Sequence, residues 1–368
     1  MLAGASRRAR SAVAGTHRGG ALLAADGPAK TSGGRAPVMG FVLTSEQFTG
    51  PQLVDLGVAA EDAGFDAVWT SDHFLPWQDN QGHVGQAWVL LGALSQRTKH
   101  IRLGTGVTCP IYRYHPAIVA QTFAALSYYA PGRLFLGCGK GEALNEAAAT
   151  GMWDKHAVRA ARWVEAIQLI RRLWTGEWVK HQGTYYRVDA KLYDKPEAPI
   201  PPYLAAAGTK STRIAGEHGD GWITDAKDAL TPRKRDAFTA GVKASKRELG
   251  AVPIIAEHWV VVGGTPEAEE AASQWRMVPK GFTKYFHDPD PRHIQREAER
   301  EIPLQSVYAD WPVSEDPDVH LKALQKLLDS GVQQVFIHSG QKDQRRVIEF
   351  YGSRVLPRIK AVAAVETG

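Results

Sequence analysis

Between Val38 and Lys360 the chain alternates short apolar runs with longer amphipathic segments, and this alternation constrains the fold more than any other feature. Eight strand-like runs with helical patterns between them favour an α/β fold, a (β/α)8 TIM barrel with inserted loops, over an open doubly wound sheet. The predicted strands are Val38–Leu43, Ala67–Thr70, Ile101–Val107, Leu134–Gly137, Pro202–Ala206, Gly221–Thr224, Ile254–Val262 and Gln334–His338. The predicted helices include Gln52–Ala63, Ala117–Tyr129, Arg159–Leu173, Thr212–His218, Leu321–Ser330 and Gln344–Val355. Pro357 should stop or kink the last helix.

We expect residues 37–368 to form one barrel domain that carries two insertions. The first, near 175–200, contains the hairpin-like run Trp178–Tyr186, and the second lies near 263–320. Long inserted segments in a compact domain are commonly lids or binding loops. Residues 1–36 are rich in Ala, Gly, Ser and Arg without periodicity, which predicts a disordered tail or a degenerate export signal.

The charge distribution argues against a nucleic-acid partner. Six basic residues against one Asp in residues 1–36 account for the whole formal charge of +5, so the remaining chain is nearly neutral. With 44% hydrophobic and 23% charged residues, the composition is that of a globular protein with a sizeable core. No apolar stretch is long enough to span a membrane. A small-molecule substrate fits these observations best.

The cysteines and an arginine pair near the N-terminus bear on the cellular compartment of the protein. Cys109 and Cys138 have neither C-x-x-C spacing nor a nearby His cluster, so we expect buried free thiols rather than a metal site or a disulfide. Free thiols favour a reducing compartment, here the cytoplasm. Ser6-Arg7-Arg8 resembles a twin-arginine export motif, so export to the cell envelope is the alternative to a cytoplasmic location. His17 and Arg18 interrupt the run that follows the motif, which argues against a working signal.

The predicted strand Ala67–Thr70 is followed at once by chemically active side chains. Asp72 and His73 come directly after it, and Trp77 lies four residues beyond the His. In a βα-repeat protein chemistry usually occurs here, because the loops after the strands form the open face of the barrel. An Asp that caps the next helix and a His packed in the core would leave the same pattern.

Two glycine-bearing segments follow the next two predicted strands. Gly104 and Gly106 permit close approach of a flat ligand, although packing against a neighbouring helix explains them equally well. Three glycines between positions 137 and 141 lack the G-x-G-x-x-G spacing, which argues against a Rossmann site. Glu142 then either projects from the strand end or is a solvated residue at a helix start. With His73 it can form a base and acid pair, and any redox step would need an organic cofactor.

Three ordered motifs make the chain resemble a known family. They are Ser71-Asp72-His73-x-x-Pro76-Trp77, Thr105-Gly106-Val107-x-x-Pro110-x-x-Arg113-Tyr114-x-Pro116 and Gly139-x-Gly141-Glu142-Ala143-Leu144-Asn145-Glu146. They resemble those of the coenzyme F420-dependent glucose-6-phosphate dehydrogenases and, equally well, of the hydroxymycolic acid dehydrogenases. Both belong to the luciferase-like superfamily of TIM barrels. The resemblance extends from about Val38 to Lys360.

The resemblance implies that the chain binds coenzyme F420, an 8-hydroxy-5-deazaflavin, with the reactive face toward the barrel centre. Asp72 would contact the ring, and Gly106-Val107 would be the non-proline cis peptide that supports its back face. Ala205-Ala206-Ala207-Gly208 matches the family's phosphate-binding turn, where N–H groups at a helix N-terminus favour an anion. The other cofactor-binding residues that the motifs imply are Thr105, Cys109, Gly139, Lys140, Gly141 and Glu142.

For catalysis the resemblance implies oxidation of a CH–OH group by hydride transfer to the deazaflavin, without a metal ion. His73 would abstract the hydroxyl proton, and Glu142 would supply a proton to the ring nitrogen of the reduced cofactor. Trp77, beside the reacting centre, would stabilise developing charge and contact the substrate. The resemblance also implies a homodimer packed through outer helices.

The expected substrate is a sugar 6-phosphate such as glucose 6-phosphate. Members that act on it hold the phosphate with two lysines and an arginine; Arg213 and Lys284 match the lysines, and Asp310 stands at the arginine position. Two cations and an anion hold a phosphate less tightly than three cations. The segments 104–116 and 191–194 are closer to the hydroxymycolic branch, so a hydroxymycolic-acid-type alcohol is the alternative.

Two further functions stay open at this point. The same barrel could serve an FMN-dependent monooxygenase, but oxygen activation does not require the pair His73 and Glu142. A non-catalytic cofactor carrier is motivated only by the departures from the family pattern at Lys140 and Asp310.

Overall fold

Eight parallel strands close into a barrel in the computed structural model, which describes residues 36–366. Around the barrel the order is β1-β10-β9-β8-β7-β4-β3-β2, and β1 pairs with both β2 and β10. The barrel strands are β1 (Val38–Leu43), β2 (Ala67–Thr70), β3 (Arg102–Thr105), β4 (Leu134–Cys138), β7 (Pro202–Ala205), β8 (Gly221–Asp225), β9 (Ile254–Trp259) and β10 (Gln334–His338). The predicted fold class is therefore confirmed. The expected tail, with its twin-arginine-like segment, lies outside the described residues.

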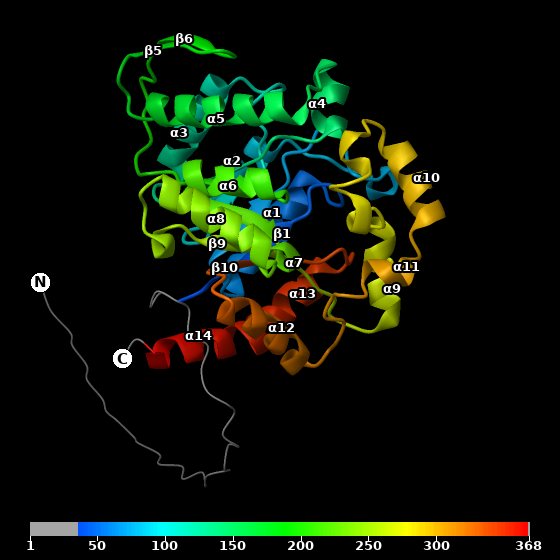
Figure 1. Cartoon of the computed structure of the whole chain (residues 1–368). Coiled ribbons are helices and arrows are strands. Elements are labelled where there is room, and N and C mark those ends of the chain that lie inside the picture. Colours follow the sequence, from blue (N-terminus) through cyan, green and yellow to red (C-terminus); the bar gives the residue numbers. More distant parts are fainter. Residues whose placement is uncertain (1–35, 367–368) are drawn as a thin grey trace, which may run out of the picture.

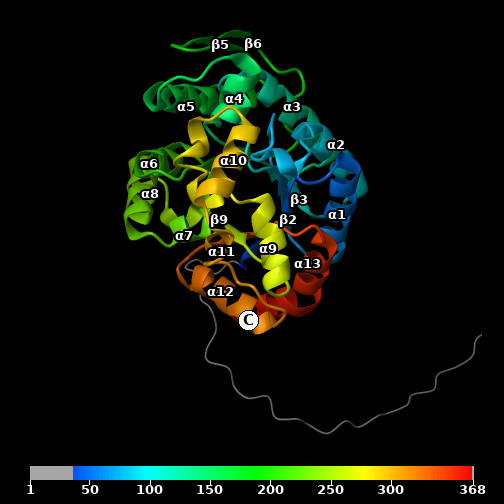
Figure 2. The same ribbon diagram turned by 90° about the vertical axis from the view of Figure 1, so that its right-hand side faces the viewer.

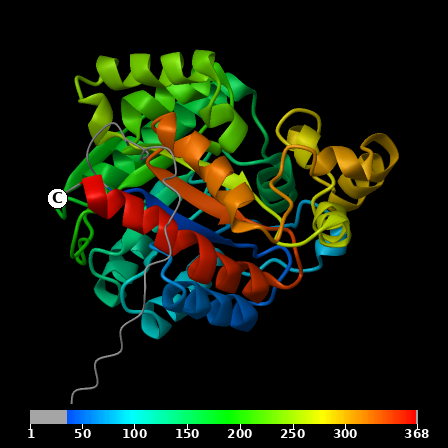
Figure 3. The ribbon, with the colours of Figure 1, turned by 90° about the horizontal axis from the view of Figure 1, so that it is seen from below.

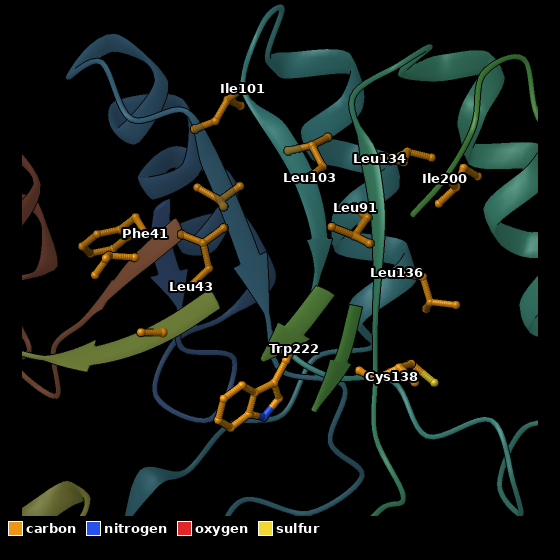
Figure 4. Close-up of a cluster of buried hydrophobic side chains, with 14 of the residues drawn as sticks. Phe41, Leu43, Leu91, Ile101, Leu103, Leu134, Leu136, Cys138, Ile200 and Trp222 are labelled. Atoms are coloured by element: carbon orange, nitrogen blue, oxygen red, sulfur yellow. The ribbon is translucent and has the colours of Figure 1, made fainter. Parts of the chain in front are cut away.

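Aromatic side chains fill the inside of the barrel. Trp69 stacks on Phe336 at 3.8 Å between ring centroids, and Phe135 packs 6.0 Å from the same Phe336 ring. Gly104 makes room for this packing, because a Cβ there would lie 2.3 Å from the Phe135 ring. Gly104 of β3 and Gly106 just after it, where a Cβ would lie 2.7 Å from Trp69, thus serve the packing of the barrel interior and not contact with a helix. The outward-facing strand residues form a second, larger core under the helices, part of which Figure 4 shows.

Helices surround the barrel on all sides, as the view along its axis in Figure 2 shows. They are α1 (Gly50–Asp62), α2 (Ala87–Arg97), α3 (Pro116–Tyr129), α4 (Ala143–Thr150), α5 (His156–Leu173), α6 (Thr209–His218), α7 (Ala226–Ala229), α8 (Pro232–Ala244), α9 (Thr265–Gln274), α10 (Pro291–Glu301), α11 (Leu304–Val307), α12 (Pro317–Asp329), α13 (Gln344–Phe350) and α14 (Leu356–Glu366). Short 3-10 turns are η1 (Asp79–Gln81), η2 (Leu249–Ala251), η3 (Val278–Lys280) and η4 (Tyr285–His287). None of the described helices is long and apolar enough to cross a membrane.

Two segments extend beyond the regular βα pattern. The antiparallel hairpin β5 (Val179–Gln182) and β6 (Arg187–Ala190) lies on the outside of α5 (Figure 1). The segment from α9 to α11, which we call the insertion, follows β9 and projects at one end of the barrel (Figure 3). In Figure 2 it lies in front of the strands. Because it follows the C-terminal end of β9, it covers the face where active sites of such barrels form.

Three strands have the predicted bounds, and the differences elsewhere have local causes. The strand predicted over Ile101–Val107 ends at Thr105, where the backbone enters a cis peptide bond at Gly106-Val107. Pro357 does not stop the last helix: a π-helical segment, η5 (Tyr351–Val355), precedes it, and α14 continues to Glu366. Pro357 is then the second residue of a new helical segment, where its missing N–H is tolerated.

Candidate active site

Asp72 is the centre of a buried polar network at the C-terminal end of β2. Its carboxylate accepts hydrogen bonds from Thr108 Oγ1 at 2.7 Å, Tyr114 OH at 3.2 Å and Arg113 Nη2 at 3.2 Å. Burial raises the pKa of Asp72, while Arg113 and the two hydroxyl donors act in the opposite direction. The carboxylate caps no helix, so the helix-capping alternative is excluded.

Arg113 joins this network to a second buried carboxylate, Glu146. Glu146 Oε2 accepts from the backbone N–H of Arg113 at 2.9 Å, and its Oε1 lies 3.7 Å from Arg113 Nε. Burial raises the pKa of Glu146 to about 7, because the bonds from Arg113 only partly offset the loss of solvent. Gly141, with φ of 73°, packs directly against Glu146; a Cβ there would lie 2.6 Å from Glu146 Cγ.

His73 is oriented by its own loop. Its Nδ1 lies 3.1 Å from the carbonyl oxygen of Leu75. A carbonyl only accepts, so Nδ1 carries the hydrogen and Nε2 is left as the basic nitrogen. Glu46 Oε1 lies 3.8 Å from the same Nδ1, and Ser71 Oγ donates to Glu46 Oε2 at 3.0 Å. A buried carboxylate in this position stabilises positive charge on the imidazole.

Glu142 and the His73 loop are held together by Asn145. The Asn145 amide donates to Glu142 Oε2 at 3.1 Å, and its Oδ1 accepts from the backbone N–H of Phe74 at 2.8 Å. Glu142 is the N-cap residue of α4 and is only partly exposed, so it stands at a helix start without being fully solvated. Asn145 therefore ties Glu142 to the loop that carries His73, through the backbone of Phe74 and not through the imidazole itself.

Trp77 lies beside His73 and under the insertion. Its ring centroid is 5.6 Å from that of His73 and 5.8 Å from that of Phe282 in the insertion. Only 5% of Trp77 is exposed, and it packs in a hydrophobic cluster with Leu144 and residues of the insertion. This indole is therefore a fixed wall of the site.

The wall between β3 and β4 suits the face of a flat ring. Val107 packs over two glycines: a Cβ at Gly139 would lie 2.6 Å from Val107 Cγ2, and one at Gly137 3.2 Å from Cγ1. The peptide bond Gly106-Val107 is cis, as the resemblance implied. An apolar isopropyl group thus lies over two residues that have no side chain, a surface that fits the deazaflavin ring of F420.

Cations gather next to the turn that follows β7. Ala207 and Gly208 are exposed immediately before α6, and Lys140 Nζ donates to Ser211 Oγ at 2.5 Å in the first turn of that helix. Burial lowers the pKa of Lys140 to about 8, and Arg159 adds to the effect. Free N–H groups at a helix start with cations beside them fit the phosphate of the same cofactor.

Thr105 and Cys109 have side chains turned into the protein. Thr105 Oγ1 donates to the carbonyl of Gly137 at 2.8 Å, and Cys109 is 3% exposed. Burial raises the pKa of the Cys109 thiol well above its usual range, with nearby carboxylates adding to the effect. Both cysteines are free and buried.

The three predicted phosphate-binding residues are not joined by contacts within the described residues. Lys284 pairs with Glu297 at 3.0 Å and with Glu301, both on α10. Asp310 accepts from Lys227 Nζ at 3.1 Å. Arg213 is exposed on α6. A phosphate site built from these residues stays a prediction.

Sequence reasoning missed several residues of the site. Arg113 and Asn145 stand in the quoted motifs, but a motif does not say which side chains meet across the barrel. Glu46 and Lys227 lie after β1 and β8 respectively, and the same strand-end rule that selected Asp72 could have found them. Within the described residues no group of three or more His, Cys, Asp or Glu could hold a metal ion.

Comparison with known proteins identifies the family. Residues 21–328 match the family model described as luciferase-like monooxygenase. The chain belongs to this luciferase-like family, and the recognition made from the three motifs is confirmed.

Several individual relatives to which the chain is similar are F420-dependent dehydrogenases. The chain is 45% identical, over 93% of its length and 94% of the relative, to an F420-dependent hydroxymycolic acid dehydrogenase of Mycobacterium tuberculosis. It is 39% identical, over 88% of the chain and 96% of the relative, to an F420-dependent glucose-6-phosphate dehydrogenase of Nakamurella multipartita. Its fold superposes with a TM-score of 0.82 on an F420-dependent secondary alcohol dehydrogenase in complex with an F420-acetone adduct, at 30% identity over 88% of this chain and 99% of that one.

Proposed function

We propose that the protein is an F420-dependent dehydrogenase that transfers a hydride from a CH–OH group of a small molecule to the deazaflavin. The observation that carries this proposal is that Asn145 holds Glu142 against the loop of His73, by accepting from the Phe74 N–H, while Val107 and two glycines line the neighbouring strand ends. The names of the relatives at 36–45% identity support the same activity and cofactor.

The residues of this chain divide the chemistry between them. F420, when bound, supplies the acceptor of the hydride. His73 Nε2 takes the hydroxyl proton, while the Leu75 carbonyl holds the ring in place and Glu46 stabilises the imidazolium. Glu142 is the group that would pass a proton to the ring nitrogen of the reduced cofactor. Val107 and the turn at Gly208 position the cofactor.

A sugar 6-phosphate such as glucose 6-phosphate is the first substrate candidate, because several relatives at 36–39% identity are named for it. A long-chain hydroxy acid is the second candidate. It is favoured by the relative at 45% identity and by the ion pair in which Asp310 neutralises Lys227.

Loss of the absorbance of oxidised F420 tests the proposal. We expect enzyme, F420 and one of the two substrate classes to bleach the cofactor, and the reacting class identifies the substrate. A binding titration is the companion measurement: tight binding of FMN with none of F420 would overturn the cofactor assignment and favour a monooxygenase. Binding of F420 without turnover of any alcohol would point to a carrier.

We also propose a homodimer and a cytoplasmic location. Exposed apolar side chains on two outer helices, among them Val89 on α2 and Tyr129 on α3, provide a surface that a second copy could cover. A monomer in sedimentation at micromolar concentration would refute the dimer. A processed form lacking about residues 1–25 in the cell envelope would refute the location.

A further inference from the structure

A row of aromatic rings leads from the proposed base to the outer surface of the insertion. His73 and Trp77 lie 5.6 Å apart, Trp77 and Phe282 5.8 Å, and Phe282 and Phe286 6.4 Å. The Phe286 ring is 5.6 Å from Trp153, which follows α4. Each ring therefore lies within the distance at which aromatic side chains pack against one another. We call this row the aromatic track.

The outer part of the aromatic track is open to solvent. Phe282 is 59% exposed although it packs edge-on against Trp77, and Phe286 is partly exposed. The turn at 281–284 and the 3-10 helix η4 that follows it bring the Phe282 and Phe286 rings side by side. An exposed apolar surface that is continuous with an active site commonly marks a ligand-binding groove.

The lysines of the same segment turn to α10, whereas Arg159 of α5 stacks on the outer end of the aromatic track, 3.8 Å from the Trp153 ring centroid and 5.0 Å from that of Phe286. The part of the track left to an apolar ligand is therefore at Trp77 and Phe282. Lys280 pairs with Glu301 at 3.1 Å, and Lys284 pairs with Glu297 at 3.0 Å and with Glu301. Both lysines are thus engaged with α10, on the side of the segment that carries the charges. The segment presents an apolar face to Trp77 and a neutralised charged face to α10.

We propose that the aromatic track binds an apolar carbon chain attached to the carbinol carbon of the substrate, with Phe282 as a specificity-determining residue. The occupant is a long-chain alcohol whose hydroxyl lies at His73 and whose alkyl chain passes Trp77 and covers Phe282. This inference rests on the proposed function and names its substrate class. Each CH₂ group buried on the track should strengthen binding by about 0.8 kcal/mol, which is a factor of about four.

The test uses secondary alcohols of increasing chain length, from 2-butanol to 2-dodecanol, with the full chain loaded with F420. For the wild type we expect kcat/KM to rise about fourfold for each added CH₂ group that the track buries. Phe282→Ala should flatten this rise, through KM more than kcat. Phe282→Leu should restore most of it, because it retains apolar area. The matched control is Tyr193→Ala, which removes an aromatic ring that is 86% exposed outside the track.

Calorimetric binding of 2-dodecanol separates this inference from the proposed function. Binding that Phe282→Ala weakens about tenfold, without any bleaching of F420, would sustain the track and overturn the dehydrogenase activity. Three results would overturn the track: no chain-length dependence in the wild type, no binding of 2-dodecanol, or an equal loss for short and long alcohols in Phe282→Ala.

Discussion

Ionisation of Glu146 should make the stability of the protein fall between pH 5 and pH 8. Its pKa rises from 4.5 to about 7 on folding because its carboxyl group is buried. The folded chain therefore holds a proton that the unfolded chain has released, and stability that is fully present below pH 4.5 is lost as the pH rises to 7. One pKa unit corresponds to about 1.4 kcal/mol, so the loss between pH 5 and 8 is about 2–3 kcal/mol.

The substitution Glu146→Gln isolates this contribution. The amide oxygen still accepts from the Arg113 N–H, but the side chain no longer titrates. Arg113 remains charged at both pH values, so its own ionisation does not contribute to the difference between them. Urea unfolding followed by tryptophan fluorescence should show the variant gaining about 2–3 kcal/mol relative to the wild type from pH 5 to pH 8.

Glu61, a carboxylate whose pKa folding lowers instead of raising, provides the control. Burial raises the pKa of Glu61, but backbone N–H groups of His100, Ile101 and Lys99 together with Arg133 outweigh it, so the net pKa is lowered. Its titration lies below pH 5, and the difference between Glu61→Gln and wild type should therefore not change between pH 5 and 8. If Glu146→Gln behaves like Glu61→Gln, Glu146 is ionised throughout and the reasoning about its burial is wrong.

Substitutions at three further positions address the proposed chemistry. His73→Ala should leave the F420 dissociation constant nearly unchanged and lower kcat by about 100-fold or more, the usual loss of a general base; unchanged kinetics would make the imidazole structural. Gly139→Ala places a Cβ 2.6 Å from Val107 and should weaken F420 binding, measured by absorbance titration, at least about tenfold. Undiminished affinity would contradict the role of Val107 and its glycines as the surface that contacts the F420 ring. Asp310→Arg removes the carboxylate beside Lys227, so it should lower KM for glucose 6-phosphate with little effect on kcat. Asp310→Asn should lower KM in the same way but by less. If Asp310→Arg instead abolishes activity on the true substrate, no phosphate binds at this position.

The sequence predicted the barrel because period-2 and period-3.6 patterns are local. Ala67–Thr70 and Gln334–His338 have the bounds that the pattern indicated. The end of β3 was not predictable by the same rule, because the apolar run continues through Val107 while the backbone turns away at the cis peptide bond. The π-helical turn before Pro357 likewise leaves no signal in hydrophobic periodicity.

The candidate site was predictable as a set of strand ends but not as a set of contacts. The positions of Asp72, His73 and Glu142 follow from where the strands stop. Asn145 bonds to the backbone of Phe74, which is 71 residues away, and this pairing exists only because β2, β3 and β4 are consecutive in the closed barrel. Ion pairs could not be predicted either, because nothing in the local sequence indicates that Lys227 pairs with Asp310.

One wall of the site, at the ends of β2 to β4, is built from buried polar contacts, and the other, in the insertion, from exposed side chains. This difference affects how easily the substrate specificity can change. On the side of β2 to β4, the carboxyl groups of Asp72 and Glu146 are buried and both bond to the half-buried Arg113, so a substitution leaves a charge without its partner. On the side of the insertion, Phe282 is exposed and the ion pairs of Lys284 are at the surface, where substitutions cost little. Relatives named for a sugar phosphate and for a hydroxy acid are all named F420-dependent. A rigid wall for the cofactor opposite a tolerant wall for the substrate gives a physical reason why the cofactor stays the same while the substrate changes.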